Sequence, residues 1–237
     1  MSVPSTERVS LGEAAYQHLR AEIVSCRLAP GERLTERSLA ESTGFGISPI
    51  RDALTRLDHD GLVRTLPRKG YQVTPLTLKS VDDLFTLWAI VGPEIARLGV
   101  RDASPERRRQ AIDAFASLGE LNRDRPSADQ DFALRLVDQA AVAFAILAAA
   151  TENDYLISIY QRLQNDMARV WALISEAEAS MPDLAVDEDW AGVLARRDGD
   201  AAAAHVEAYV RESHRRILRI LSRWPSVVSS EIVSLRD

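Results

Sequence analysis

The side chains whose types and spacing best suit chemistry lie between residues 50 and 59, where polar and apolar residues follow helical spacing. Apolar residues recur at i, i+3, i+4 and i+7 and predict one buried stripe of a helix: Ile50, Ala53, Leu54 and Leu57. The opposite face would carry Arg51, Asp52, Thr55, Arg56 and His59. Guanidinium and hydroxyl groups on such a face could contact phosphates or base edges. This face is therefore a candidate surface for binding nucleic acid.

The pair Ser48-Pro49 predicts where this helix begins. A Ser oxygen can accept a free amide of the first turn, and Pro suits the first helical position because the hydrogen it lacks would be unpaired there. We therefore expect a helix that begins at Ser48 and ends near Asp60. A shorter helix should precede it, capped by Thr35 and ending at Gly44. Together the two helices predict a helix-turn-helix over residues 35–60.

Two short β-prone runs follow, at residues 62–66 and 71–74, joined by a turn that contains Gly. This pattern predicts a hairpin with Arg68 and Lys69 at its tip. Taken alone, each cation would be a solvated turn residue. After a helix-turn-helix, however, such a hairpin would be the wing of a winged helix, and its basic tip would reach a phosphate or a minor groove.

The rest of the chain is helical by periodicity, including a short helix predicted at 227–235. We therefore expect a mainly α fold in two domains. Residues 1–75 would form a winged helix-turn-helix with a two-stranded β wing, and residues 76–79 a linker. Residues 80–237 would form an all-α bundle of six or seven helices.

The net charge of −6 looks unsuited to nucleic-acid binding until it is divided by segment. Residues 1–75 carry 10 Lys and Arg against 9 Asp and Glu, whereas residues 76–237 carry 19 against 26. Because phosphates are neutralised by locally placed cations, overall acidity does not exclude DNA. No apolar run approaches the roughly 18 residues of a membrane span, so we expect a cytoplasmic protein without a membrane partner.

Enzyme motifs are not found in the sequence. It holds no Gly-rich phosphate loop, no nucleophile motif and no helix with the His-Glu pattern of a metallohydrolase. Its single Cys26 cannot form an internal disulfide and is expected to be a packed thiol rather than a redox sensor. We therefore expect a protein that is not an enzyme.

Many positions at fixed spacing in residues 30–73 resemble the winged-helix domain of the GntR superfamily of bacterial transcriptional regulators. The resemblance is carried by Pro30-Gly31-Glu32-Arg33-Leu34, Leu39-Ala40, Ser48-Pro49-Ile50-Arg51-Asp52-Ala53-Leu54, Leu57, Gly61-Leu62-Val63 and Arg68-x-Gly70-x-x-Val73. The helical remainder looks like the FadR-type branch, whose C-terminal FCD-type domain binds an effector and helps form the dimer. The resemblance implies a homodimer that presents two recognition helices to a near-palindromic operator, as repressor or activator.

The resemblance also implies which residues contact DNA. With the exposed helix face, the candidate set is Arg37, Ile47, Ser48, Pro49, Arg51, Thr55, Arg68, Lys69 and Gly70. Ile47 departs from the family pattern, which has a base-reading Arg there. An apolar contact, for example to a thymine methyl, could replace it, so we expect an operator that differs at that position. Arg37 and Arg51 could instead pair with neighbouring carboxylates.

Most members of the FadR-type branch hold a divalent metal with one Asp and three His. Only four His are present here, and His18 and His59 belong to the first domain, so a three-His site in the second is excluded. His205 and His214, nine residues apart, would lie on different sides of one helix. We therefore expect neither a metal nor another cofactor.

Without metal ligands, a cavity in the bundle would suit an apolar ligand. The predicted lining is Phe132, Leu136, Phe144, Trp171, Trp190 and Tyr209. The fatty-acid-responsive members of the branch also lack the metal and bind a long-chain acyl-CoA, so the ligand would be an acyl-CoA or another apolar or unknown small molecule. A metal-bound carboxylate or a ligand-independent DNA-binding scaffold are further alternatives, because aromatic residues at helical spacing can also be ordinary core.

Overall fold

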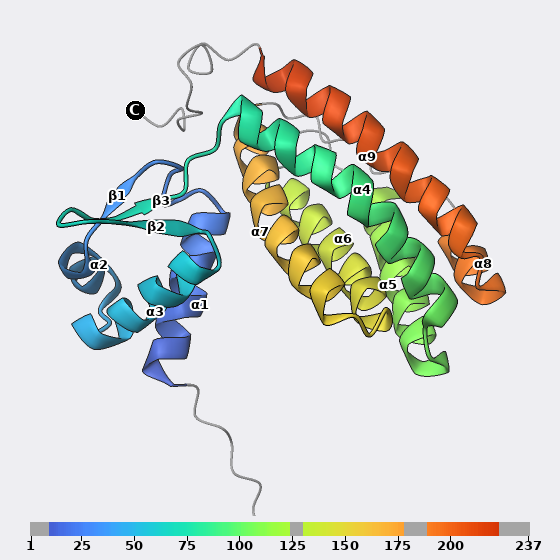
Figure 1. Cartoon of the computed structure of the whole chain (residues 1–237), viewed down its shortest axis with the longest axis horizontal. Coiled ribbons are helices and arrows are strands. Elements are labelled where there is room, and N and C mark those ends of the chain that lie inside the picture. Colours follow the sequence, from blue (N-terminus) through green and yellow to red (C-terminus); the bar gives the residue numbers. More distant parts are fainter. Residues whose placement is uncertain (1–9, 124–129, 178–188, 223–237) are drawn as a thin grey trace, which may run out of the picture. The chain divides into compact units, whose positions relative to one another are not determined.

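The computed structural model describes residues 10–123, 130–177 and 189–222 (Figure 1). The described residues form two compact units, one ending at Pro75 and the other beginning at Leu76. The helix predicted at 227–235 lies outside the described residues. The chain is mainly helical, with a small antiparallel sheet in the first unit, as the sequence predicts.

The first unit combines helices with a three-stranded antiparallel sheet. In chain order its elements are α1 (Leu11–Val24), β1 (Arg33–Leu34), α2 (Glu36–Thr43), α3 (Ile47–His59), β2 (Val63–Leu66) and β3 (Gly70–Val73). The strands lie in the order β1-β3-β2, with Arg33 opposite Gln72 and Val63 opposite Val73. The hairpin of β2 and β3 was predicted, whereas β1 was not, because two residues are too few to show alternation.

The core of this unit is built around α3. The predicted stripe is confirmed, since Ile50, Ala53, Leu54 and Leu57 are all 0% exposed. Apolar residues of α1 and of the hairpin pack against that stripe. They are Ala15, Leu19, Ile23, Leu62, Val63 and Val73. With one face buried on this core, α3 has its other face available.

The ends of α2 are as predicted, but the start of α3 is not. Thr35 caps α2 by accepting a hydrogen bond from the Ser38 amide at 3.1 Å, and Gly44 ends it at a left-handed φ of 77°. The prediction that α3 begins at Ser48 is wrong, because Gly46 is the cap and Ile47 the first helical residue. The Ile50 amide donates to the Gly46 carbonyl at 3.2 Å, and Pro49 still falls in the first turn, where amides have no partner within the helix.

The second unit is a helical bundle. Its described helices are α4 (Leu78–Asp102), α5 (Pro105–Arg123), α6 (Gln130–Ala150), α7 (Asp154–Ala177), α8 (Trp190–Arg196) and α9 (Gly199–Leu221). Helix α4 lies along α9 and also packs on α6, which in turn contacts α5 and α7 (Figure 1). None of the helices within the described ranges is both long and apolar enough to cross a bilayer.

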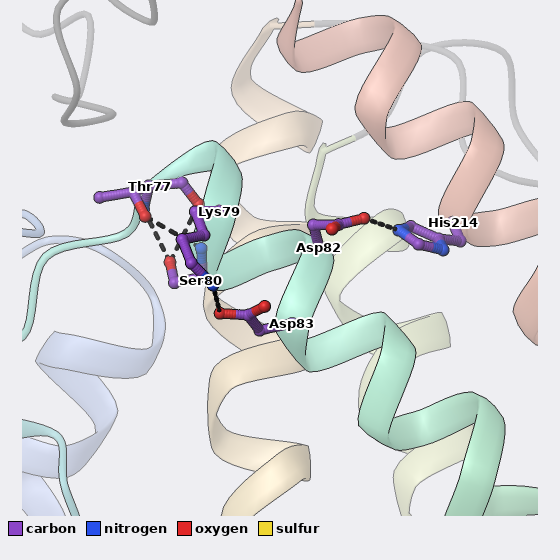
Figure 2. Close-up of polar contacts among 6 residues, drawn as sticks. All are labelled: Thr77, Lys79, Ser80, Asp82, Asp83 and His214. Carbon is purple, nitrogen blue, oxygen red and sulfur yellow. Dashed lines mark hydrogen bonds and ion pairs between the residues drawn. The ribbon is translucent and has the colours of Figure 1, made fainter.

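Paired side chains fix the start of α4 (Figure 2). Thr77 accepts from the Ser80 amide at 2.9 Å, and the Ser80 hydroxyl accepts from the Thr77 amide at 2.8 Å, which is a capping box. The helix therefore begins at Leu78, within residues 76–79 that were predicted as a linker. One turn on, Asp82 lies 2.9 Å from Nε2 of His214, so the same end of α4 is tied to α9.

Candidate nucleic-acid interface

The exposed face of α3 begins with a row of side chains one turn apart. Ile47 is 42% exposed, and Arg51 and Thr55 follow it at i+4 and i+8, both exposed. The Thr55 hydroxyl donates to the Arg51 carbonyl at 3.0 Å. Ser48 is exposed beside Ile47, and Pro49 is half-buried. This part of the predicted helix face is therefore exposed.

Arg51 is held by a carboxylate of the preceding helix. Its Nε lies 2.9 Å from Oε1 of Glu36 and its Nη2 lies 2.8 Å from Oε2, so the contact is bidentate. This pairing holds the pKa of the Glu36 carboxyl below its usual value and raises the pKa of Arg51. The guanidinium side chain stays 61% exposed. Arg51 is thus paired within the unit and still reachable from solvent.

Arg37 is the more open of the two arginines. Its side chain is 87% exposed, and its Nε lies 2.9 Å from Oε1 of Glu41, one turn along the same helix. An exposed pair of this kind contributes little to stability and is easily exchanged for a phosphate. Both predicted arginines therefore have carboxylate partners without being buried by them.

The turn between β2 and β3 presents two cations. Arg68 takes a left-handed φ of 63°, and the Lys69 amide donates to the Leu66 carbonyl at 2.9 Å. Both side chains are exposed, and within the described part of the chain neither has a hydrogen bond or an ion pair. Gly70 has a structural role, because a Cβ there would come 2.5 Å from the Leu34 carbonyl oxygen of β1.

Arg56 lies on the predicted exposed face but is used to attach α3 to α1. Its Nη1 lies 2.6 Å from Oε2 of Glu13, and its guanidinium stacks over the Tyr16 ring at 3.9 Å. The Tyr16 hydroxyl donates to Asp60 at 2.6 Å. Burial, and then this hydrogen bond, raises the pKa of Tyr16 to about 12. Spacing within α3 gave no signal of this contact, since its partners come from another helix.

In the bundle, three of the six predicted effector residues line a common cavity: Phe144, Trp171 and Tyr209. The remaining lining comes from Trp88, Val137, Ala140, Ala141, Tyr160, Leu163, Gln164 and Met167. Phe132 and Leu136 are buried elsewhere, and Trp190 stacks on Phe115 with ring centroids 4.2 Å apart. Periodicity identified aromatic residues correctly as interior but could not assign them to the cavity.

The cavity is small, and none of the described residues that line it carries a charge. Its volume is about 50 Å³, against about 300–1,000 Å³ for drug-sized ligand sites, so it has room for a few waters. The Tyr160 hydroxyl lies 2.8 Å from Oε1 of Gln164 and 2.9 Å from the Ala141 carbonyl oxygen. Burial raises the pKa of Tyr160, and it raises the pKa of Tyr209 to about 12. Both phenols therefore act as neutral hydrogen-bonding groups.

A second depression of about 360 Å³, as open to solvent as the first, lies along α4 and α9. Its lining is Ala89, Pro93, Glu207, Val210, Arg211, His214 and Arg215. Arg211 pairs with Glu207 and Arg215 with Glu212, so these cations are already neutralised. Because its arginines are paired with neighbouring carboxylates, this groove shows no preference for a ligand charge.

The histidines of the bundle have packing partners. His205 lies edge-on to Trp190, with ring centroids 5.7 Å apart, and His214 stacks on Phe85 at 5.1 Å while contacting Asp82. Among residues 10–123, 130–177 and 189–222, no group of three or more His, Cys, Asp or Glu is arranged to hold a metal ion.

Known proteins are similar to the chain in both units. The family model described as "Bacterial regulatory proteins, gntR family" matches residues 11–73. An HTH-type transcriptional regulator from the TAR-I ttuE-ttuC' intergenic region of Agrobacterium vitis is 34% identical over 149 residues, covering 59% of this chain and 85% of that protein. YdhC, an HTH-type transcriptional regulator of Bacillus subtilis (strain 168), is 40% identical over 72 residues, which span 30% of this chain and only 32% of YdhC.

Longer matches extend across the bundle. The Nta operon transcriptional regulator of Aminobacter aminovorans is 27% identical over 209 residues, covering 84% of this chain and 90% of that protein. Among solved structures, E. coli McbR/YncC matches with a TM-score of 0.72 at 16% identity, over 90% of this chain and 99% of that chain. At this identity, the structural likeness shows a shared fold alone.

Proposed function

The chain belongs to the GntR family of bacterial regulatory proteins and is an HTH-type transcriptional regulator, and we propose that it reads its operator with α3 and the β2–β3 wing. The observation that carries this proposal is the division of α3 into two faces. One face is fully buried, and the other presents Ile47, Arg51 and Thr55 in a row. A helix divided in this way can enter a major groove without disturbing its own core.

In the proposed complex each element has its own task. Arg51 donates to a guanine, and Ile47 contacts an apolar group such as a thymine methyl. Arg37 and Lys69 bind phosphates, and Arg68 binds a phosphate or the adjacent minor groove. The remaining residues of the proposed DNA-binding surface are Ser48, Pro49, Thr55 and Gly70. The exposure of the cations and their lack of buried partners support this assignment.

We further propose a homodimer of the FadR type, in which the bundle is the FCD-type effector domain. A two-fold dimer would present two α3 helices to the half-sites of a near-palindromic operator. An effector that prefers one arrangement of the two heads would then change operator affinity. The helical bundle that follows the winged helix supports this organisation.

For the effector we favour a small, neutral and largely apolar molecule in the cavity beside Trp88 and Tyr160. The aromatic lining without charges supports a neutral ligand, and the volume of about 50 Å³ disfavours a long acyl chain unless the helices move apart. A metal-bound carboxylate remains the alternative, and a ligand-independent scaffold is the second. A thermal-shift screen with aromatic compounds, acyl-CoAs and Zn²⁺ plus dicarboxylates separates the three.

DNA binding is tested by sequencing the genomic fragments that the purified protein selects. We expect one near-palindromic motif, and Arg51→Ala should lose preference at one base pair of each half-site. Glu22→Gln is the control, because Glu22 belongs to the same unit and pairs with Arg27 instead. If the wild-type protein selected no common sequence, the proposed function would be wrong.

A further inference from the structure

We propose that Glu36 is a specificity-determining residue, because it holds the Arg51 guanidinium so that one defined edge faces the DNA bases. This inference rests on the proposed function, which places Arg51 at a guanine. Glu36 is the first residue of α2 and Arg51 lies in the first turns of α3, so the contact crosses the helix-turn-helix. No side chain of the wing or of the bundle is required for it.

The donor geometry of arginine shows what the contact leaves available. A guanidinium has five N–H donors, one on Nε and two on each Nη. Glu36 accepts from Nε at 2.9 Å and from Nη2 at 2.8 Å, which occupies one edge of the fork. The second edge, formed by Nη1 and the other Nη2 hydrogen, stays unused by this carboxylate. Two parallel donors of this kind match O6 and N7 of guanine.

The carboxylate is the better fixed partner. The Glu36 side chain is 25% exposed against 61% for Arg51, and its backbone follows directly after Thr35, the cap of α2. Burial, and then the charge of Glu36, raise the pKa of Tyr71 in β3. A long side chain that is already held in its bound conformation loses less freedom on contacting a base. Glu36 therefore makes Arg51 selective without touching DNA itself.

A negative charge beside the groove also has an opposite effect. It weakens attraction to every phosphate backbone, whatever the sequence. Removing it should therefore strengthen binding to random DNA while weakening discrimination at one base pair. A purely structural residue would change both affinities together, and a residue that merely blocks Arg51 would improve operator binding when removed. These three patterns are distinguishable by measurement.

The experiment uses the full-length protein and the operator that the wild type selects. Affinity is measured for this site, for the site with the Arg51-dependent guanine replaced, and for random DNA. Variants are Glu36→Gln, Glu36→Asp and Arg51→Ala, together with the double variant of Glu36→Gln and Arg51→Ala. The matched control is Glu22→Gln, because Glu22 also binds Nε and Nη2 of an arginine, Arg27, at 3.0 and 2.7 Å.

We expect Glu36→Gln to lower guanine discrimination roughly three- to tenfold, less than the about 5- to 150-fold loss of a whole bidentate contact. Glu36→Asp should lose discrimination as well, because it keeps a charge at the first turn of α2 but cannot reach both nitrogens. In the Arg51→Ala background, Glu36→Gln should change discrimination no further. Glu22→Gln should leave it unchanged.

Two results would overturn the inference while leaving DNA recognition intact. One is unchanged guanine discrimination in Glu36→Gln, with Arg51→Ala still losing it. The other is tighter operator binding with sharper discrimination, which would make Glu36 a competitor of DNA. If instead the wild-type protein selected no site, the proposed function itself would fail.

Discussion

The helix-turn-helix unit and the helical bundle both pair arginines at the surface, but they differ in whether polar side chains are also buried. In the first unit the core is apolar throughout, and arginines pair at the surface, as Arg51 does with Glu36. Among the described residues, the buried polar side chains all belong to the bundle: Asn165, Arg169 and Ser213. Arg169 is 0% exposed, and its Nη1 lies 3.2 Å from Asp166. Burial raises the pKa of the Asp166 carboxyl, which the charge of Arg169 opposes.

This difference determines what each unit can change. Hydrophobic contacts, unlike hydrogen bonds and ion pairs, do not require partners in fixed directions. Surface residues of the first unit can therefore be substituted without loss of folding. A buried charge requires a partner in a fixed place, and removing that partner is strongly destabilising. The DNA-contacting residues of the first unit can therefore be substituted without affecting its core, whereas the buried polar residues of the bundle must keep their partners.

The largest effect is expected from breaking a pair in each unit. Arg169→Ala should lower the free energy of unfolding by about 3 kcal/mol, because it empties a fully buried site and removes the charge that opposes the effect of burial on the half-buried Asp166. Arg56→Ala, which removes an exposed pair with Glu13 in the first unit, should cost less than about 1 kcal/mol. Denaturant unfolding followed by far-UV circular dichroism, which reports on the helices of both units, measures both losses. Equal losses in the two variants would contradict the contrast between the units.

The next effect concerns base preference. Ile47→Arg should restore a guanine-reading donor at the first residue of α3, and so change preference at one base pair by about 1–3 kcal/mol. Because Ile47 is 42% exposed, the thermal stability of the first unit should be nearly unchanged. A binding-site selection with both proteins checks this. An identical selected motif would show that residue 47 does not read DNA.

A smaller effect is expected at the junction of α1 and α3. Tyr16→Phe removes the hydrogen bond to Asp60 and should lower the free energy of unfolding by about 1 kcal/mol at neutral pH. Because the pKa of Tyr16 is raised to about 12 when folded, its contribution is complete below pH 10 and is lost as pH rises toward 12. Between pH 10 and 12 the free energy of unfolding should therefore fall less steeply with pH in Tyr16→Phe than in the wild type. Parallel curves would assign the alkaline loss to other groups.

The smallest effect is expected at the wing tip. Lys69→Ala should weaken binding to all sequences alike and reduce the slope of log affinity against log salt by about 1. Stability should not change, since the Lys69 side chain is exposed. Titrations of operator and random DNA at several salt concentrations measure this. A loss confined to the operator would instead make Lys69 a base-reading residue.

Residue patterns predicted the first unit well because its elements are defined locally. The buried stripe of α3 follows from periodicity, and the cap at Thr35 from residue type. Ser48 was misplaced because Ser followed by Pro fits both a cap and a first turn, and only the backbone of Gly46 distinguishes them. The contacts of Arg51 and Arg56 depend on which helices meet, and spacing within one helix does not contain that information.

The bundle was predictable in class but not in detail. Helical periodicity predicted its helices, and the aromatic residue type predicted which side chains lie in the interior. Trp190 and Phe144 are both aromatic residues predicted to line the cavity, yet Trp190 stacks on Phe115 while Phe144 lines the cavity. Tyr160, whose hydroxyl meets Gln164 there, was not among the predicted lining. The choice between core and cavity is made by helix packing, which one sequence does not reveal.

The close approach of Gly70 to the Leu34 carbonyl has a practical consequence for protein engineering. The strand that meets the wing at Leu34 continues through Thr35 directly into Glu36, so the wing and the support of Arg51 share one short piece of backbone. Grafting α3 alone onto another regulator would leave that support behind. The smallest portion of this chain that could transfer its reading of DNA to a chimera is therefore residues 33–73.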